Sequence, residues 1–317
     1  MNPVFLFLEV AATVLFVGAA GAALRRGRLP FLELISAAAF GLLLEEGDQL
    51  IFQTYHYSSD WVLVLDRAPL IIGLTWALLI AGAMRITDAL GVRRWTAPFV
   101  DAVLVIMLDL AFDAVAIRIG MWTWVGVAPD QGWFGVPAGN FYAWLFVTLG
   151  FSLLTRWLRD WSARHPDAEW LQLGIPAPAF AILVTSIVPF ALIMQLTGAE
   201  TGGGLWLFAI VLAGFVVIAV RGTFGRGRQA PDGQANAIVD LRLAFFTRFS
   251  MHGFFLLALV VMGIAVQLPI LLVTSVTLFA VDVWIARLVE SRRTVSAAGP
   301  STPALAAAPG PARMADQ

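Results

Sequence analysis

Residues 204–220 read GLWLFAIVLAGFVVIAV, seventeen consecutive positions without a charged side chain. A helix needs about 20 predominantly apolar residues to cross the roughly 30 Å hydrocarbon core of a bilayer. Similar runs recur along the chain, so we expect an all-α, polytopic membrane bundle of about nine transmembrane helices, with seven as the lower bound. The expected spans are 4–24, 31–52, 68–84, 97–117, 139–157, 175–196, 204–220, 247–266 and 268–288.

The composition agrees with a membrane protein and excludes several other classes. Of the 317 residues, 60% are hydrophobic and 13% are charged, and the mean hydropathy is +0.84. Soluble domains carry about 25% charged residues, so a soluble enzyme, a disordered regulator and a nucleic-acid-binding module are excluded. The chain has no cysteine and only three histidines, which excludes thiolate metal sites and di-iron sites built on histidine boxes. We expect neither a cofactor nor a metal ion.

The arginines determine the expected orientation. All twenty basic residues are Arg; with nine spans and an outside N-terminus, eighteen of them lie in cytoplasmic segments, and only Arg67 and Arg118 lie outside. Basic residues concentrate in the cytoplasmic loops of membrane proteins. We therefore expect a multi-pass protein of the cell membrane with its C-terminus in the cytoplasm. Residues 1–290 are expected to form a single transmembrane domain, and the Ala- and Pro-rich residues 291–317 a disordered cytoplasmic tail.

Two acidic residues interrupt the fourth span. Asp109 and Asp113 are four positions apart in an otherwise apolar run, and such residues share one face of a helix. Because a charge at mid-membrane costs about 3 kcal/mol or more, both carboxyls are expected to face the interior of the bundle. In the expected orientation they lie at the level of Glu45, near the end of the second span, and Asn140, at the start of the fifth. A structural ion pair between Asp113 and Arg118 is the alternative to a functional role.

The loops expected at the same level are rich in aromatic residues. Trp and Tyr are common in the belt at the membrane interface, and this interpretation remains open for Trp61 and Trp133. The alternative is that the rings line a site together with the carboxyls. The aromatic residues concerned are Tyr55, Tyr57, Trp61, Trp122, Trp124 and Trp133.

The other acidic residues of the spans are expected to be solvated or isolated. Glu9 has no apparent partner, and Asp282 lies in the inner half of the ninth span, away from the carboxyl pair. Hydration is cheap near span ends. The acidic residues near span ends are Glu33, Glu46, Asp48 and Asp101.

A carboxyl pair in an apolar site favours one kind of chemistry. Burial favours the neutral form of a carboxyl, and a second carboxyl nearby favours it further. One of the pair can then remain protonated at neutral pH and act as a general acid. Proton transfer to an unactivated alkene requires such an acid and gives a tertiary carbocation, which aromatic faces stabilise. Water or an internal double bond then quenches the cation, so these residues indicate proton-initiated chemistry on a membrane-dissolved polyene.

The middle of the chain, about residues 41–160, also resembles a known family. The similarity is to carotenoid biosynthesis proteins of the hydratase type, which include the bisanhydrobacterioruberin and γ-carotene hydratases. The motifs that carry the resemblance are Glu45, Tyr55-His-Tyr57, Pro69 with Trp76, Leu108-Asp-Leu-Ala-Phe-Asp113, Gly120-Met-Trp-Thr-Trp124, Gly135-Val-Pro137, and Asn140-Phe141 with Trp144.

The resemblance implies a membrane enzyme of carotenoid biosynthesis. It would add water, without a cofactor, across a terminal double bond of a linear carotenoid and give a tertiary alcohol. Asp109 or Asp113 would donate the proton, and Glu45 would be its partner or the base that orients water. The expected partners are the membrane lipid and the carotenoid or another polyene. The implied substrate-binding side chains are Tyr55, Tyr57, Trp76, Trp122, Trp124, Asn140 and Trp144.

Three alternatives are compatible with the same residues. Cyclisation of lycopene begins with the same protonation but gives a product of unchanged mass, whereas hydration adds the mass of water. A prenyltransferase would need a second Asp-rich site for Mg²⁺ and diphosphate, and Asp109/Asp113 has no second copy. A non-catalytic carrier of polyene or isoprenoid lipids would use the two aspartates as a proton relay and form no product.

Overall fold

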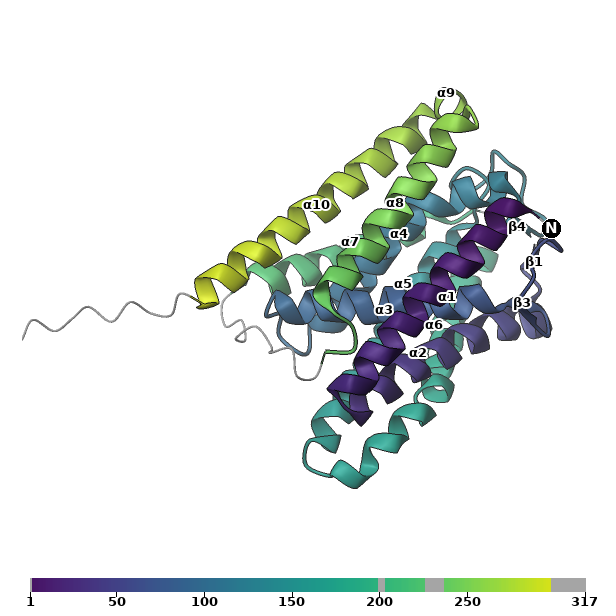
Figure 1. Cartoon of the computed structure of the whole chain (residues 1–317). Coiled ribbons are helices and arrows are strands. Elements are labelled where there is room, and N and C mark those ends of the chain that lie inside the picture. Colours follow the sequence, from purple (N-terminus) through teal and green to yellow (C-terminus); the bar gives the residue numbers. More distant parts are fainter. Residues whose placement is uncertain (1, 199–202, 226–236, 298–317) are drawn as a thin grey trace, which may run out of the picture.

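The computed structural model describes residues 2–198, 203–225 and 237–297, and within them the chain is almost entirely helical. This confirms the expected all-α polytopic bundle (Figure 1). The long helices follow the nine expected spans in order. They are α1 (Pro3–Arg26), α2 (Arg28–Gly47), α3 (Leu70–Ala89), α4 (Ala97–Ile119), α5 (Ala138–Ser162), α6 (Pro176–Leu196), α7 (Leu205–Phe224), α8 (Leu241–Val261) and α10 (Pro269–Ala297).

Short elements complete the described part of the chain. Two small antiparallel ribbons pair β1 with β4 and β2 with β3, and a π-helix continues α2 toward β1. The short elements are the π-helix η1 (Asp48–Phe52), β1 (Tyr55–Tyr57), β2 (Val64–Leu65), β3 (Ala68–Pro69), β4 (Trp122–Trp124), the 3₁₀ helix η2 (Pro166–Gly174) and α9 (Ile264–Gln267).

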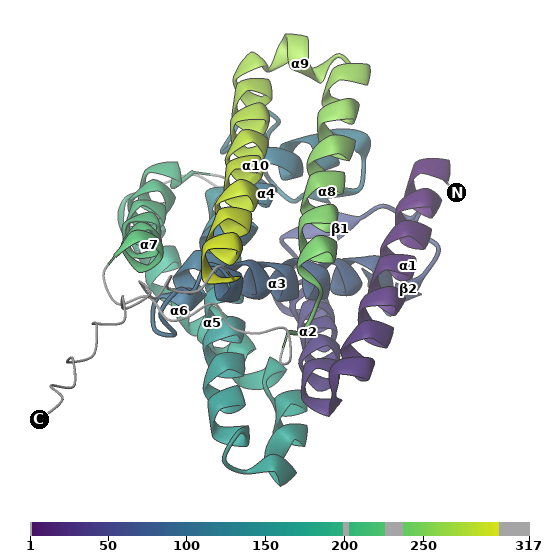
Figure 2. The ribbon, with the colours of Figure 1, turned by 60° about the vertical axis from the view of Figure 1, so that its left-hand side comes forward.

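Seven of the described helices are long and apolar enough to cross a membrane: α1, α3, α5, α6, α7, α8 and α10. The other two long helices, α2 and α4, fall outside this set. They carry Glu45 and the Asp109/Asp113 pair, respectively. Helix α4 is central, since it packs against α3, α5, α7, α8 and α10, while α1 and α8 both pack against α3 (Figure 2). The helices that carry Glu45 and the Asp109/Asp113 pair are thus shielded by apolar neighbours.

The end of the chain differs in detail from the expected boundaries. Helix α8 begins at Leu241, six residues before the eighth expected span, and ends at Val261. The short α9 occupies Ile264–Gln267, where that span was expected to end. Helix α10 continues to Ala297, beyond the position where the tail is expected to begin. The rest of that expected tail, 298–317, lies outside the described residues.

Two acidic residues expected to be solvated are buried and paired instead. Glu33 is fully buried and forms a two-pronged ion pair with Arg159, at 2.8 and 2.9 Å. Asp101 is also fully buried, and its Oδ2 lies 3.0 Å from Nη2 of Arg156. The sequence interpretation was wrong because each helix end packs against another helix, whose arginine replaces the water.

Arg248 is likewise not the loop residue that the arginine distribution implied. It lies inside α8, 2% exposed, and pairs with Asp282 of α10 at 2.8 Å. His252, one turn further along α8, contacts the same carboxyl at 3.0 Å. Glu9, for which no partner was apparent, accepts the backbone N–H groups of Val62 and Leu63, both at 2.9 Å. These contacts hold the α8–α10 hairpin together and fix the loop after β1 to α1.

Helices α2 and α3 approach each other through glycines. A Cβ atom added to Gly41 would lie 2.6 Å from Cβ of Trp76 and 3.0 Å from Cα of Gly73. No side chain larger than hydrogen fits there without separating the helices. Gly41 is one turn before Glu45, so this close approach determines how near Glu45 lies to α3.

Substitution Gly41→Ala should therefore destabilise the protein by about 1–3 kcal/mol, because an overpacked core must shift. The matched control is Gly18→Ala in α1, where an added Cβ would have no neighbour within 4 Å. Its higher helix propensity should leave stability unchanged or raise it by up to about 1 kcal/mol. Thermal unfolding in detergent, followed by circular dichroism, measures both. Equal effects of the two substitutions would contradict the proposed packing constraint.

Candidate active site

The β1–β4 ribbon presents four aromatic side chains on one face. Tyr55 pairs with Trp124 and Tyr57 with Trp122, and alternate residues of a strand point to the same side. Tyr55 and Trp124 meet edge to face at 4.9 Å, and Tyr57 and Trp122 at 6.3 Å. His56, between the two tyrosines, is exposed on the other face. The Y-x-Y and W-x-W spacings therefore form one aromatic wall.

A turn at the end of α4 brings this wall to the carboxyl pair. Gly120 ends the helix with φ of 84°, a left-handed conformation that favours glycine. The chain reverses there, and Nε1 of Trp122 donates a hydrogen bond to Oδ1 of Asp113 at 3.0 Å. The glycine of the G-x-W-x-W motif is thus what lets a β4 side chain reach the helix before it.

Asn140 connects the two carboxyls. Its Nδ2 donates to Oδ2 of Asp109 at 3.0 Å and to Oδ2 of Asp113 at 2.7 Å, and its Oδ1 accepts from Nε1 of Trp144 at 3.1 Å. Asp109 is 0% exposed and Asp113 2% exposed. The other oxygen of Asp109 is buried without a hydrogen-bond partner. Two carboxyls that share one amide group are too close to carry two negative charges in an apolar environment, so this arrangement suits a pair that retains a proton.

Glu45 forms a second centre with different hydrogen bonds. Its Oε2 accepts the hydroxyls of both Tyr55 and Tyr57, and its Oε1 accepts Nε1 of Trp76 at 2.8 Å. An ionised carboxyl only accepts hydrogen bonds, and three donors match that form. Burial, together with the nearby Glu45, raises the pKa of both tyrosine hydroxyls well above the usual value. The tyrosines therefore remain donors at physiological pH.

One cavity of 840 Å³ connects these groups. This volume is within the usual range of about 300–1,000 Å³ for small-molecule sites. Nine of the ten predicted site residues line the cavity, and the tenth, Asp109, accepts a hydrogen bond from the lining residue Asn140. They are Glu45, Tyr55, Tyr57, Trp76, Asp113, Trp122, Trp124, Asn140 and Trp144.

The remaining walls of the cavity are mainly apolar, with three hydroxyl side chains among them, and reach the outer surface of the bundle. Side chains of α1, α3 and α8 form them, including Phe7 and Leu257, which are 64% and 63% exposed. The lining on α8 extends from Phe246 to Leu257, about 17 Å along the helix axis. The cavity is therefore elongated and open on the apolar surface of the bundle. The carboxyl groups that line it are grouped in one part of its wall.

Comparison with known proteins agrees with these motifs. A family model described as carotenoid biosynthesis protein matches residues 1–220. The chain belongs to the carotenoid biosynthesis protein family. No curated protein and no solved structure matches the chain. Membership of the carotenoid biosynthesis protein family supports a role in carotenoid biosynthesis, as an enzyme of that pathway. The match ends within α7, so the α8 wall lies outside it.

The structure also distinguishes between the alternative interpretations of Arg118 and of Trp61. Arg118 forms no ion pair with Asp113 in the described structure and donates instead to the carbonyls of Ala114 and Phe134. Trp61 is buried, stacks on Phe5 at 4.4 Å and lines the cavity. It therefore belongs to the cavity wall and not to an exposed belt.

Some lining residues were not predicted from the sequence. The walls from α1 and α8 consist of ordinary apolar residues, which look the same in sequence as residues that face lipid. Arg248 and His252 stand four apart in α8, as Asp109 and Asp113 do in α4, which indicates a buried face. That face contacts Asp282 and neither residue lines the cavity, so this signal does not identify the wall.

Asn140→Leu should lower stability by about 1–3 kcal/mol, because it removes both donors from two buried carboxyls. In the Asp109→Leu/Asp113→Leu background the same substitution should cost clearly less, since the oxygen atoms that accept the two hydrogen bonds are gone. A double-mutant cycle on apparent melting temperatures in detergent measures this coupling. Equal costs in the two backgrounds would show that Asn140 does not act on the carboxyls.

Proposed function

We propose that this carotenoid biosynthesis protein hydrates a terminal double bond of a linear carotenoid, without a cofactor, to give a tertiary alcohol. The observation that supports it is a pair of buried carboxyls that accept hydrogen bonds from one amide group, one of which, Asp113, lines an elongated apolar cavity with aromatic walls. Such a site can hold an acid next to a hydrocarbon. The open side of the cavity suits a substrate dissolved in the membrane lipid.

The first step in this proposal is proton transfer from Asp113, the member of the pair that lines the cavity. A new C–H bond forms at the less substituted carbon of the terminal double bond, and the positive charge remains on the other carbon, which becomes a tertiary cation. The faces of Trp122, Trp124 and Tyr57 stabilise this cation through their ring quadrupoles. Asp109 acts as the positioning partner that keeps a proton on the pair.

The second step is attack of water on the cation. Glu45 accepts a proton from the attacking water, whose oxygen forms the new C–O bond, and Tyr55 and Tyr57 hold the carboxylate in place. Return of that proton to the aspartate pair restores the site. One water molecule and one alkene give one alcohol, and no electrons are exchanged.

We further propose the cell membrane as the location, with the N-terminus outside and the C-terminus in the cytoplasm. The support is the distribution of arginines in the expected loops, which still holds when Arg248 is counted inside α8. The site then lies toward the outer leaflet.

Expression in a host that accumulates lycopene, followed by mass analysis of the extracted pigments, tests the proposal. Hydration predicts a pigment heavier by one or two water molecules. An isomer of unchanged mass would indicate cyclisation instead. Tight binding of pigment to the purified protein without any new product would indicate a carrier.

Asp113→Asn should lower hydrated product by about 100-fold or more, since a general acid contributes at least that factor. Asp109→Asn should lower it less, because that carboxyl does not line the cavity. The control is Asp130→Asn, an exposed acidic residue of the loop after β4, which should retain full activity. Full activity of Asp113→Asn in equally abundant protein would exclude it as the donor.

A further inference from the structure

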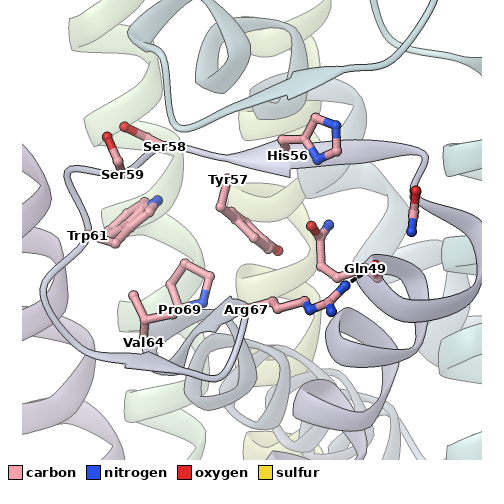
Figure 3. A pocket seen from close by; sticks show the side chains of 10 residues that line it. Gln49, His56, Tyr57, Ser58, Ser59, Trp61, Val64, Arg67 and Pro69 are labelled. Atoms are coloured by element: carbon pink, nitrogen blue, oxygen red, sulfur yellow. Dashed lines mark hydrogen bonds between the residues drawn. The ribbon is translucent and has the colours of Figure 1, made fainter.

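A second pocket of 440 Å³ lies beside the cavity and differs from it in character. It is formed by η1, β1, the loop that follows β1, and β2–β3 (Figure 3). Its lining contains two amides, an imidazole, two serine hydroxyls and a guanidinium. A site for ordered water needs two to four polar partners within reach, and this lining offers them. The polar lining residues are Gln49, Gln53, His56, Ser58, Ser59 and Arg67.

The polar pocket and the apolar cavity share two side chains, Tyr57 and Trp61. Figure 3 shows the Tyr57 ring between Trp61 and Gln49. Trp61 is held in place, because its ring stacks on Phe5 and its Nε1 donates to the carbonyl of Met121 at 3.2 Å. The Tyr57 hydroxyl donates a hydrogen bond to Glu45. The partition between pocket and cavity is therefore one aromatic ring thick, and Glu45 lies at its edge.

A polar path leads from this pocket to the same carboxyl. Gln49 is four residues after Glu45, so it lies on the same face one turn further along. It is 8% exposed, lines the pocket, and its Nε2 donates to the carbonyl of Tyr55 at 2.8 Å. The amide of Gln49 and the hydroxyl of Tyr57 thus lie between the pocket and Glu45.

We propose that the polar pocket is the entry route for water, which passes Gln49 and Tyr57 to reach Glu45. This inference rests on the proposed hydration, because the apolar walls of the cavity exclude the water that the second step consumes. The carotenoid would enter through the apolar cavity and water through the polar pocket. These separate routes keep the carbocation away from bulk water until the carboxylate of Glu45 can direct the attack. The water supply then decides between hydration and loss of a proton to an isomer of unchanged mass.

The first test measures access to the pocket and does not depend on activity. The chain has no cysteine, so Gln49→Cys and Thr75→Cys each introduce a single thiol, the second in the apolar cavity only. In lipid nanodiscs, a charged, membrane-impermeant methanethiosulfonate should modify Gln49→Cys about tenfold or more faster than Thr75→Cys, since thiol reactivity follows access. Equal protection of both thiols would overturn the proposal.

The second test closes the pocket by size alone. Val64 is 46% exposed and lines the pocket, whereas Val62, 50% exposed, lies in the same loop outside it. Val64→Trp should fill the pocket, slow the labelling of Gln49→Cys, and lower the ratio of alcohol to unchanged-mass isomer by about tenfold or more, because water is kept from the site. Val62→Trp should change neither.

The two proposals fail in different ways. If the parent protein forms alcohol and Val64→Trp forms it in the same ratio, the water route is wrong and hydration stands. If no alcohol forms in any host but Val64→Trp blocks labelling of Gln49→Cys and Val62→Trp does not, the pocket is an aqueous path to Glu45 and hydration is wrong. A folded state of each variant is checked by its helical circular dichroism and gel-filtration profile.

Discussion

Two carboxyls on one helix share a single amide group inside an apolar bundle, and the site is organised around that contact. Asn140 has only two amide hydrogens, and Asp109 and Asp113 each receive one. Helix α5 must therefore begin beside the C-terminal half of α4, and Trp144 must lie one turn further along α5 to donate to the same side chain. The turn at Gly120 and the β1–β4 ribbon then complete the enclosure of the pair.

Six of the seven buried acids of the described chain fall into two groups, according to which side chains stabilise them; the seventh, Glu9, accepts only backbone N–H groups. Asp101, Glu33 and Asp282 each face an arginine, an arrangement that neutralises a charge and fixes neighbouring helices. Glu45, Asp109 and Asp113 are contacted by neutral donors instead: Asn140, two tyrosines and two tryptophans. Neutral donors leave the carboxyls able to exchange a proton, which an arginine would prevent. The division separates structural acids from those suited to chemistry.

Features of the fold and the site that depend on local sequence could be predicted, whereas contacts between residues far apart in the chain could not. The spans followed from hydropathy, and the shared face of Asp109 and Asp113 followed from helix periodicity. The convergence of Glu45, the tyrosines and Asn140 followed from loop order and motif spacing. The partners of Glu33 and Arg248 did not, since Glu33 pairs with a residue more than a hundred positions away, and Arg248 meets Asp282 across a hairpin. The role of Gln49 depends on a pocket formed by several separate segments. The α8 wall depends on which face of α8 lines the cavity, and the polar residues of α8 lie on more than one face and do not identify it.

The central claim is that the Asp109–Asp113 pair holds a proton at neutral pH while it faces the cavity. Infrared difference spectroscopy of the purified protein tests this directly, because a protonated carboxyl has a carbonyl stretching band that a carboxylate lacks. The account predicts such a band at neutral pH, its shift in heavy water, and its loss in the Asp109→Asn/Asp113→Asn variant. A spectrum in which the parent protein and the variant show the same protonated-carboxyl signal would contradict it.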